Sequence, residues 1–206
     1  LGINVITADY LPDNKAHKYS DEYHNVSIID KDAILQLAED LQIDGIVSYA
    51  TDPGVVVAAY VAEKLGLPTS PYESVKILQN KGKFRGFLRD NNFNVPYSET
   101  FKEYSEIELS KFKFPIIVKP VDSAGSKGVT RVDDETALRA AFEYALKYSI
   151  TGEVIIEEFI EKKGYSTDTD SFSIDGKLVL ATFNDQCFDE TANNPYTPAG
   201  YIYPCS

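Results

Sequence analysis

The chain has 206 residues, of which 43% are hydrophobic and 25% charged, a composition typical of a folded globular protein and not of a disordered one. Its formal net charge is −12, so its surface repels nucleic-acid backbones and anionic lipids, and neither is expected as a partner. No apolar run approaches the roughly 20 residues that span a bilayer, and Cys187 and Cys205 form no disulfide or zinc pattern, so a cytoplasmic protein is expected.

Strands and helices alternate along the first part of the chain. Short β-branched runs predict strands at residues 3–8, 26–29 and 45–49. Asp30 is placed to cap a helix over residues 31–41, whose apolar side chains fall on one face, and a second helix over residues 51–65 would end at Gly66. This alternation predicts an α/β fold with an open parallel sheet of the doubly wound kind.

Two more helices are expected before the pattern changes. The sequence Ser70-Pro71-Tyr72-Glu73 is typical of a helix start, because it combines a capping box with proline at the first helical position. Another helix is predicted over residues 81–90, and Asn94-Val95-Pro96 then interrupts the pattern. We therefore place a domain boundary there, with one domain over residues 1–95 and another over 96–206.

The second domain has a different rhythm. Strands are predicted at residues 114–119, 129–132 and 154–159. Asp133 and Asp134 are placed to cap a helix, and Asp175-Gly176 favours a two-residue turn in a hairpin between residues 170 and 183. These elements predict an α+β domain with antiparallel strands, and the tail after Asn184 is expected to be a loop.

Both ends of the sequence look incomplete. The chain contains no methionine and begins with Leu1-Gly2, a pair typical of the end of a helix. We expect a first strand and helix to precede it, with removal of an initiator methionine as the alternative. The tail stops without a closing element, which predicts further chain beyond it.

The segment KPVDSAGSKGVTRV, residues 119–132, joins two predicted strands. Because a strand follows it, the segment matches neither the Walker-A motif nor the dinucleotide-binding fingerprint, which both open a helix. Its glycines expose backbone N–H groups that can form a concave anion site, with hydroxyl and ammonium groups nearby. The residues concerned are Ser123, Gly125, Ser126, Lys127 and Gly128. An ordinary surface hairpin is the alternative.

Three segments in this order resemble the ATP-grasp superfamily. They are Asn80-Lys81-Gly82-Lys83-Phe84-Arg85, the strand that ends in Lys119-Pro120 before the Gly/Ser-rich loop, and Glu157-Glu158-Phe159-Ile160. Over nearly the whole chain the pattern is most similar to carbamoyl-phosphate-synthase-like members, which include carboxylate–amine ligases. The resemblance implies a biotin-carboxylase-like, Rossmann-like substrate domain (the pre-ATP-grasp domain), followed by the first part of an ATP-grasp domain.

The resemblance also implies which residues meet the phosphates of ATP. Lys81 and Lys119 match lysines that approach the nucleotide, and a cation fixed by a rigid strand stabilises the charge of a transferring phosphoryl group. The loop residues Ser123, Gly125, Ser126 and Gly128 would lie over the phosphates. Lys127 is either a further phosphate contact or a solvated loop lysine.

A second set of residues matches the adenine side of the family's site. The backbone of Glu158 and Ile160, within the segment Glu157, Glu158, Phe159 and Ile160, would pair with the adenine edge. Val129 would pack on the ring, with an ordinary place in the hydrophobic core as the alternative. An edge strand is the alternative for this segment. Glu161 is the candidate for the ribose hydroxyls, although the family's usual [DE]-G-x-E turn is absent.

The implied reaction activates a carboxylate as an acyl phosphate for attack by an amine, with ATP and Mg²⁺ as cofactors and a small carboxylate and amine as substrates. No catalytic and no metal-ligating residue is assigned, because nothing after Asn184 resembles the family's acidic magnesium segment. We therefore expect the Mg²⁺ ligands in chain beyond this stretch, and we expect this stretch alone to be inactive.

A homodimer is left open. A non-catalytic nucleotide-binding module is the alternative function, and an NAD-type Rossmann protein is disfavoured because no glycine fingerprint is visible.

Overall fold

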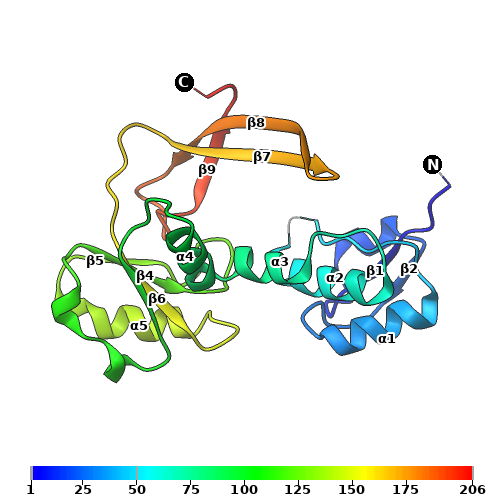
Figure 1. Ribbon diagram of the computed structural model, residues 1–206, viewed down its shortest axis with the longest axis horizontal. Helices are drawn as coiled ribbons and strands as arrows, with labels where there is room; N and C mark the ends of the chain where they lie inside the picture. Colours follow the sequence, from blue (N-terminus) through cyan, green and yellow to red (C-terminus); the bar gives the residue numbers. More distant parts are fainter. Residues whose placement is uncertain (1, 50, 206) are drawn as a thin grey trace. The chain divides into compact units, whose positions relative to one another are not determined.

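The computed structural model describes residues 2–49 and 51–205, which form two compact units that divide between Val95 and Pro96. The first unit contains four α-helices and a parallel strand pair among its described residues, and the second contains two antiparallel sheets and the helix α5 (Leu138–Leu146) (Figure 1). Parallel strands in the first unit and antiparallel strands in the second confirm the predicted α/β fold class.

In the first unit, strands β1 (Ile6–Ala8) and β2 (Glu22–His24) pair in parallel. Helix α1 (Lys31–Leu41) begins where predicted, because the Asp30 carboxylate accepts a hydrogen bond from the Ala33 amide at 3.1 Å. Helix α2 (Asp52–Leu65) ends at Gly66, whose φ of 68° suits glycine. The buried side chains of the two helices form the core of this unit and comprise Ile34, Ala38, Val57 and Val61.

Two strands predicted in the first unit are wrong. Residues 26–29 lead into a turn and residues 45–49 form no strand in the described part of the chain, whereas β2 lies in a stretch that carried no strand prediction. Val26 and Ile46 instead pack, partly buried, against the α1–α2 core. Their apolar character is accounted for by side-chain burial and requires no strand pairing.

Helices α3 (Tyr72–Gln79) and α4 (Lys81–Asp90) complete the first unit. The predicted capping box at Ser70 is wrong, since Pro71 occupies the N-cap position and no cap side chain bonds the helix. Glu63, at the end of α2, supplies the acceptor instead, and its carboxylate lies 3.0 Å from the Tyr72 amide nitrogen. A carboxylate near a helix N-terminus also interacts favourably with the helix dipole.

The second unit is built on a four-stranded antiparallel sheet in the order β3 (Ser98–Phe101), β6 (Val154–Glu158), β4 (Ile116–Pro120) and β5 (Thr130–Val132). Helix α5 (Leu138–Leu146) covers one face of it (Figure 1). The core between helix and sheet consists of Phe101, Phe112, Ile116, Val118, Val132, Leu138, Ala141, Phe142, Ala145, Val154 and Ile156.

A three-stranded antiparallel sheet follows, made of β7 (Ser166–Ile174), β8 (Lys177–Phe188) and β9 (Pro198–Ile202). The β7–β8 turn is the predicted hairpin, with φ of 49° at Asp175 and 74° at Gly176 as a type I′ turn requires. The prediction of a loop after Asn184 is wrong, because β8 continues to Phe188 and β9 pairs with it. Gly, Pro and Tyr in β9 gave no alternating pattern that would have marked a strand.

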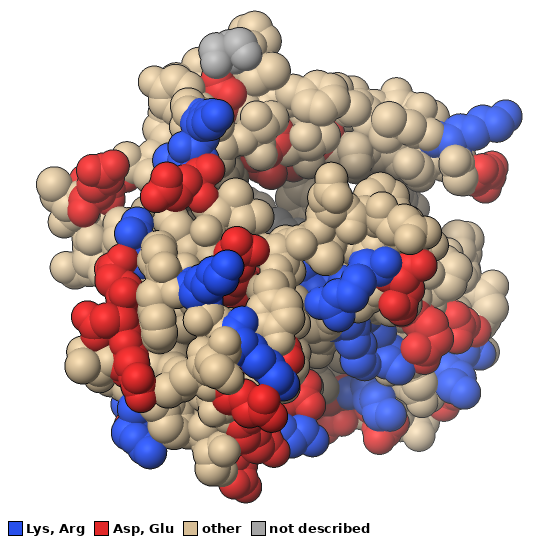
Figure 2. Space-filling view, turned by 60° about the vertical axis from the view of Figure 1, so that its left-hand side comes forward, with Lys and Arg blue, Asp and Glu red and all other residues tan. Residues whose placement is uncertain are grey.

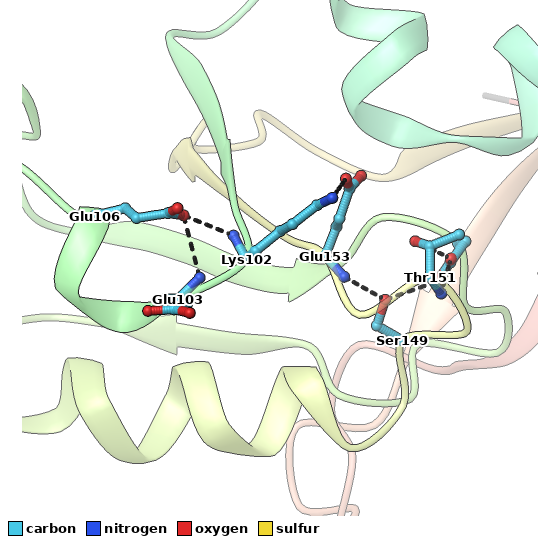
Figure 3. A network of polar contacts seen from close by, with 7 residues as sticks. Lys102, Glu103, Glu106, Ser149, Thr151 and Glu153 are labelled. Atoms are coloured by element: carbon cyan, nitrogen blue, oxygen red, sulfur yellow. Dashed lines mark hydrogen bonds and ion pairs between the residues drawn. The ribbon is translucent and has the colours of Figure 1, made fainter.

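Short 3₁₀ helices occupy several connections, at Lys15–Tyr19, Tyr104–Glu106, Leu109–Lys111 and Glu135–Ala137. In the one that ends at Glu106, the Glu106 carboxylate accepts hydrogen bonds from the backbone amides of Lys102, at 2.9 Å, and Glu103, at 3.1 Å (Figure 3). The bonds from the Glu103 and Lys102 amides hold the pKa of Glu106 below its usual value of 4.5.

We expect Glu106→Gln to reduce the pH dependence of stability. A carboxyl group whose pKa is lower in the folded state stabilises the fold above pH 4.5, and this contribution disappears as the pH falls through the folded pKa. Chemical denaturation should therefore show the variant less stable than the wild type at neutral pH and equally stable well below pH 4.5. Glu190→Gln, at an exposed glutamate, is the control. A difference that persists unchanged in acid would contradict the assignment.

Candidate functional site

The face of the four-stranded sheet opposite α5 carries charge at its centre. Ile117 and Lys119 project from β4 to this face, and Glu157 lies directly across from Ile117 on β6. The Lys119 ammonium is 2.8 Å from the Glu157 carboxylate, and the exposed side-chain fractions are 17% and 4%. Alternation along β4 therefore separates a purely apolar core face from a face with a largely buried ion pair.

The glycine-rich loop, residues 121–129, starts directly after Lys119 and Pro120. Positive φ angles occur at Gly125 (64°), Ser126 (55°) and Gly128 (74°). A Cβ at Gly128 would come within 3.0 Å of Pro120 and 3.1 Å of Tyr148, so the loop returns closely onto the end of β4. Turns of this kind can bring successive backbone N–H groups to one side, the arrangement in which backbone binds anions.

Asp122 anchors the base of the loop. One of its carboxylate oxygens accepts hydrogen bonds from the Ser149 hydroxyl (3.1 Å) and the Ile150 amide (2.9 Å). The other accepts from the amide (2.8 Å) and hydroxyl (2.6 Å) of Thr151. The Ser149 hydroxyl oxygen in turn accepts a hydrogen bond from the Glu153 amide (Figure 3). These bonds fix the turn before β6 to the loop. Sequence reasoning did not select Asp122, because its partners lie 27 to 29 residues away.

The hinge segment, residues 157–160, runs from the end of β6 into an exposed stretch. The Glu158 amide donates to the Tyr97 carbonyl at 2.9 Å, and the Phe159 amide donates to the Pro115 carbonyl at 3.3 Å. Ile160 is 66% exposed, and its amide takes part in no backbone hydrogen bond within residues 2–49 and 51–205. The Ile160 amide can therefore donate to a ligand, as an adenine-binding backbone must.

Arg131 lies on strand β5, which follows the glycine-rich loop, and contacts the hinge segment. Its guanidinium lies 4.5 Å from the centre of the Phe159 ring and 2.8 Å from the Asp133 carboxylate. A guanidinium stacked on an aromatic ring is attracted by the negative face of the ring. By register Arg131 lies opposite Ile117, on the same sheet face as Lys119, so it is a further cation at this face that sequence reasoning did not select.

The clamp segment, residues 194–196, joins the glycine-rich loop from the connection between β8 and β9. The Ser126 hydroxyl donates to the Tyr196 carbonyl at 2.8 Å, and the Asn194 side-chain amide donates to the Ser126 carbonyl at 2.9 Å. These contacts lie in the tail after Asn184, which was predicted to be a loop. Nothing in the local sequence pointed to them.

The structure brings most of the predicted site residues into one unit. Lys119, Glu157, the glycine-rich loop with Lys127 and Val129, and the hinge segment with the exposed Glu161 all belong to the second unit. Lys81 belongs to the first unit, where it begins α4 after the N-cap residue Asn80. Its contact with the phosphates therefore stays a prediction, as do the ligand contacts of the other residues.

On the face shown in Figure 2, basic and acidic side chains are interleaved. Within residues 2–49 and 51–205, no three or more His, Cys, Asp or Glu residues are grouped so that they could hold a metal ion. No helix of the described chain is long and apolar enough to cross a membrane.

Comparison with protein families gives one match that covers most of the chain. A family model described as an ATP-grasp domain matches residues 78–205. Formate-dependent phosphoribosylglycinamide formyltransferase from Rhodococcus jostii (strain RHA1) is 27% identical over 191 residues, and the same enzyme from Burkholderia vietnamiensis (strain G4 / LMG 22486) is 28% identical over 172 residues. Each match covers 78% of this chain and 41% of the relative, so the chain spans about two fifths of the length of these curated relatives.

Solved structures share the fold. The L-amino acid ligase from Bacillus licheniformis superposes with a TM-score of 0.70 at 22% identity, covering 98% of this chain and 50% of the ligase. N5-carboxyaminoimidazole synthetase from Staphylococcus aureus, complexed with ADP, gives a TM-score of 0.68 at 18% identity, covering 89% of this chain and 48% of the synthetase. At these identities the likeness establishes the architecture.

Proposed function

Because the chain belongs to the ATP-grasp family, we propose that its second unit binds ATP and that the whole protein is an ATP-dependent ligase. In this proposal the glycine-rich loop covers the phosphates, Lys119 lies at the base of the loop, and the hinge segment pairs with the adenine edge. Lys81 approaches the phosphates from the first unit, and Glu161 the ribose.

One observation carries the proposal: Lys119 is the last residue but one of strand β4, next to a loop that contains three left-handed residues and returns onto the end of the strand. The strand and the ion pair with Glu157 hold the ammonium in place. A fixed cation beside a cluster of backbone N–H groups stabilises an anionic phosphate with little reorganisation. An ordinary surface hairpin, which is the alternative, would leave the largely buried Lys119–Glu157 ion pair at its base without a function.

The proposed reaction joins a carboxylate to an amine. A carboxylate oxygen of the substrate attacks the γ-phosphorus of ATP, the bond to the β-phosphate oxygen breaks, and ADP leaves. The amine nitrogen then attacks the acyl carbon, phosphate leaves, and the amine's surplus proton is released. The residues of this chain bind and orient ATP and neutralise its charge, which accounts for the lysines and loop amides at the site.

Calorimetric titration of the purified protein with ATP, and separately with NAD, tests the binding step. We expect saturable binding of ATP and none of NAD, because the site has a phosphate loop between strands and no dinucleotide fingerprint. Binding of NAD without any binding of ATP would contradict the proposal.

Incubation of the whole protein with ATP, Mg²⁺, small carboxylates and hydroxylamine then tests turnover, since an acyl phosphate is trapped as a hydroxamate. ATP binding without a hydroxamate or ligation product favours the non-catalytic nucleotide-binding module.

A further inference from the structure

The clamp segment holds the glycine-rich loop through a single residue, Ser126. Both the hydroxyl and the carbonyl of Ser126 are engaged, by the Tyr196 carbonyl and by the Asn194 side-chain amide. The oxygen of the same Asn194 amide accepts the Tyr196 backbone N–H at 3.1 Å. The amide oxygen of Asn194 therefore holds the clamp segment, and its amide nitrogen holds the loop.

Ser126 is the loop residue for which such support matters most. Its φ of 55° lies in the left-handed region, which Gly125 and Gly128 adopt at no steric cost but which a residue with a Cβ adopts rarely. The turn bonds inside the loop are long, at 3.5 Å from the Lys127 amide to the Ala124 carbonyl and 3.4 Å from the Val129 amide to the Ser126 carbonyl. The two shorter bonds from the clamp segment are thus the stronger restraint on Ser126.

The clamp segment is itself fixed near the hinge. The side chain of Tyr196 is half-buried, and burial raises its pKa above the usual 10.0, against the opposing effect of the nearby Arg131. Arg131 also stacks on Phe159 of the hinge segment. Tyr196 therefore lies close to Arg131, which in turn contacts the hinge segment.

We propose that Asn194 is a positioning residue for the polyphosphate: together with the Tyr196 backbone it holds Ser126 in its left-handed conformation, and so keeps the loop N–H groups aimed at the phosphates of a bound nucleotide. The inference rests on the proposed function, because it presupposes that ATP binds at this loop. Asn194 acts through Ser126 and needs no contact with ATP. The adenine edge, paired with the hinge segment, is independent of it.

The test compares ATP with adenosine, which lacks phosphates. We expect Asn194→Ala to raise the Kd for ATP about tenfold, the effect of losing roughly one net hydrogen bond, and to leave the Kd for adenosine unchanged. Asn193→Ala is the matched control, since Asn193 is the adjacent, exposed amide, and it should bind both ligands like the wild type. Adding Ser126→Gly to Asn194→Ala should recover part of the ATP affinity, because glycine adopts the left-handed conformation unaided.

Three outcomes overturn the inference. Unchanged ATP affinity in Asn194→Ala, with a wild type that binds ATP, removes the positioning role and leaves the proposed function standing. Equal losses of ATP and adenosine affinity, or a lowered denaturation midpoint that accounts for the loss, indicate a general structural role. A wild type that binds adenosine and ATP equally, or neither, shows that the loop does not bind phosphates, and the proposed function then fails with the inference.

Discussion

Lys119→Met is expected to abolish detectable ATP binding and to lower the free energy of unfolding by about 3 kcal/mol. The ammonium lies 2.8 Å from the carboxylate of Glu157, whose side chain is only 4% exposed. Removing the cation leaves that carboxylate's charge in a poorly solvated place without its ion-pair partner Lys119, which is the reason why breaking buried ion pairs is costly. ATP binding fails for a separate reason, since the fixed positive charge at the loop's base is lost.

A second variant separates these two effects. In Lys119→Met combined with Glu157→Gln, neither buried charge is present, so most of the stability should return while ATP still does not bind. Urea denaturation measures the first quantity and calorimetric titration the second. Lys113→Met, which removes an exposed lysine just before the same strand, is the control and should change neither. Normal ATP affinity in the double variant would contradict the role given to Lys119.

Gly128→Ala is expected to lower the free energy of unfolding by about 2 kcal/mol and to weaken ATP binding strongly. The new methyl group would meet Pro120 at 3.0 and 3.1 Å and the Tyr148 ring at 3.1 Å, and the φ of 74° is unfavourable for alanine. The loop would have to move away from the end of β4 to relieve the contacts. That movement displaces the backbone N–H groups on which phosphate binding depends.

Gly125→Ala provides the comparison for this prediction. Its φ of 64° is similar, but a Cβ at this position has no heavy atom within 4 Å beyond its neighbours in the chain. Only the conformational cost of roughly 1 kcal/mol should therefore remain. Denaturation and ATP titration of both variants measure the difference. Equal losses in the two variants would show that close packing of the loop on Pro120 and Tyr148 is unimportant.

The features that could be predicted from the sequence are those decided by neighbouring residues. The cap at Asp30, the helix end at Gly66 and the Asp175-Gly176 turn each depend on bonds or φ angles within a few residues, and the structure contains all three. The order of three motifs was enough to identify the family, because the family model covers residues 78–205. These motifs contain Lys119 and Glu157, although their direct pairing was not foreseen.

Strands with short or irregular sequences were the main failures. Strand β2 has three residues and β9 reads PAGYI, and neither shows the alternation that marks a half-buried strand. Each exists because a partner strand supplies backbone hydrogen bonds, β1 in one case and β8 in the other. Pairing of this kind is a property of the assembled sheet and leaves a weak trace in the segment itself.

The sequence by itself determined the fold class, the family and the chemical character of the glycine-rich loop, since composition, motif order and glycine positions carry that information locally. Only the tertiary structure decided what holds the loop in place. Asp122 bonds residues 27 to 29 positions away, and Ser126 bonds the clamp segment 68 to 70 positions away. Hydrogen bonds at such separations form only after the sheets have brought distant residues together, because no local conformational preference extends over that length of chain.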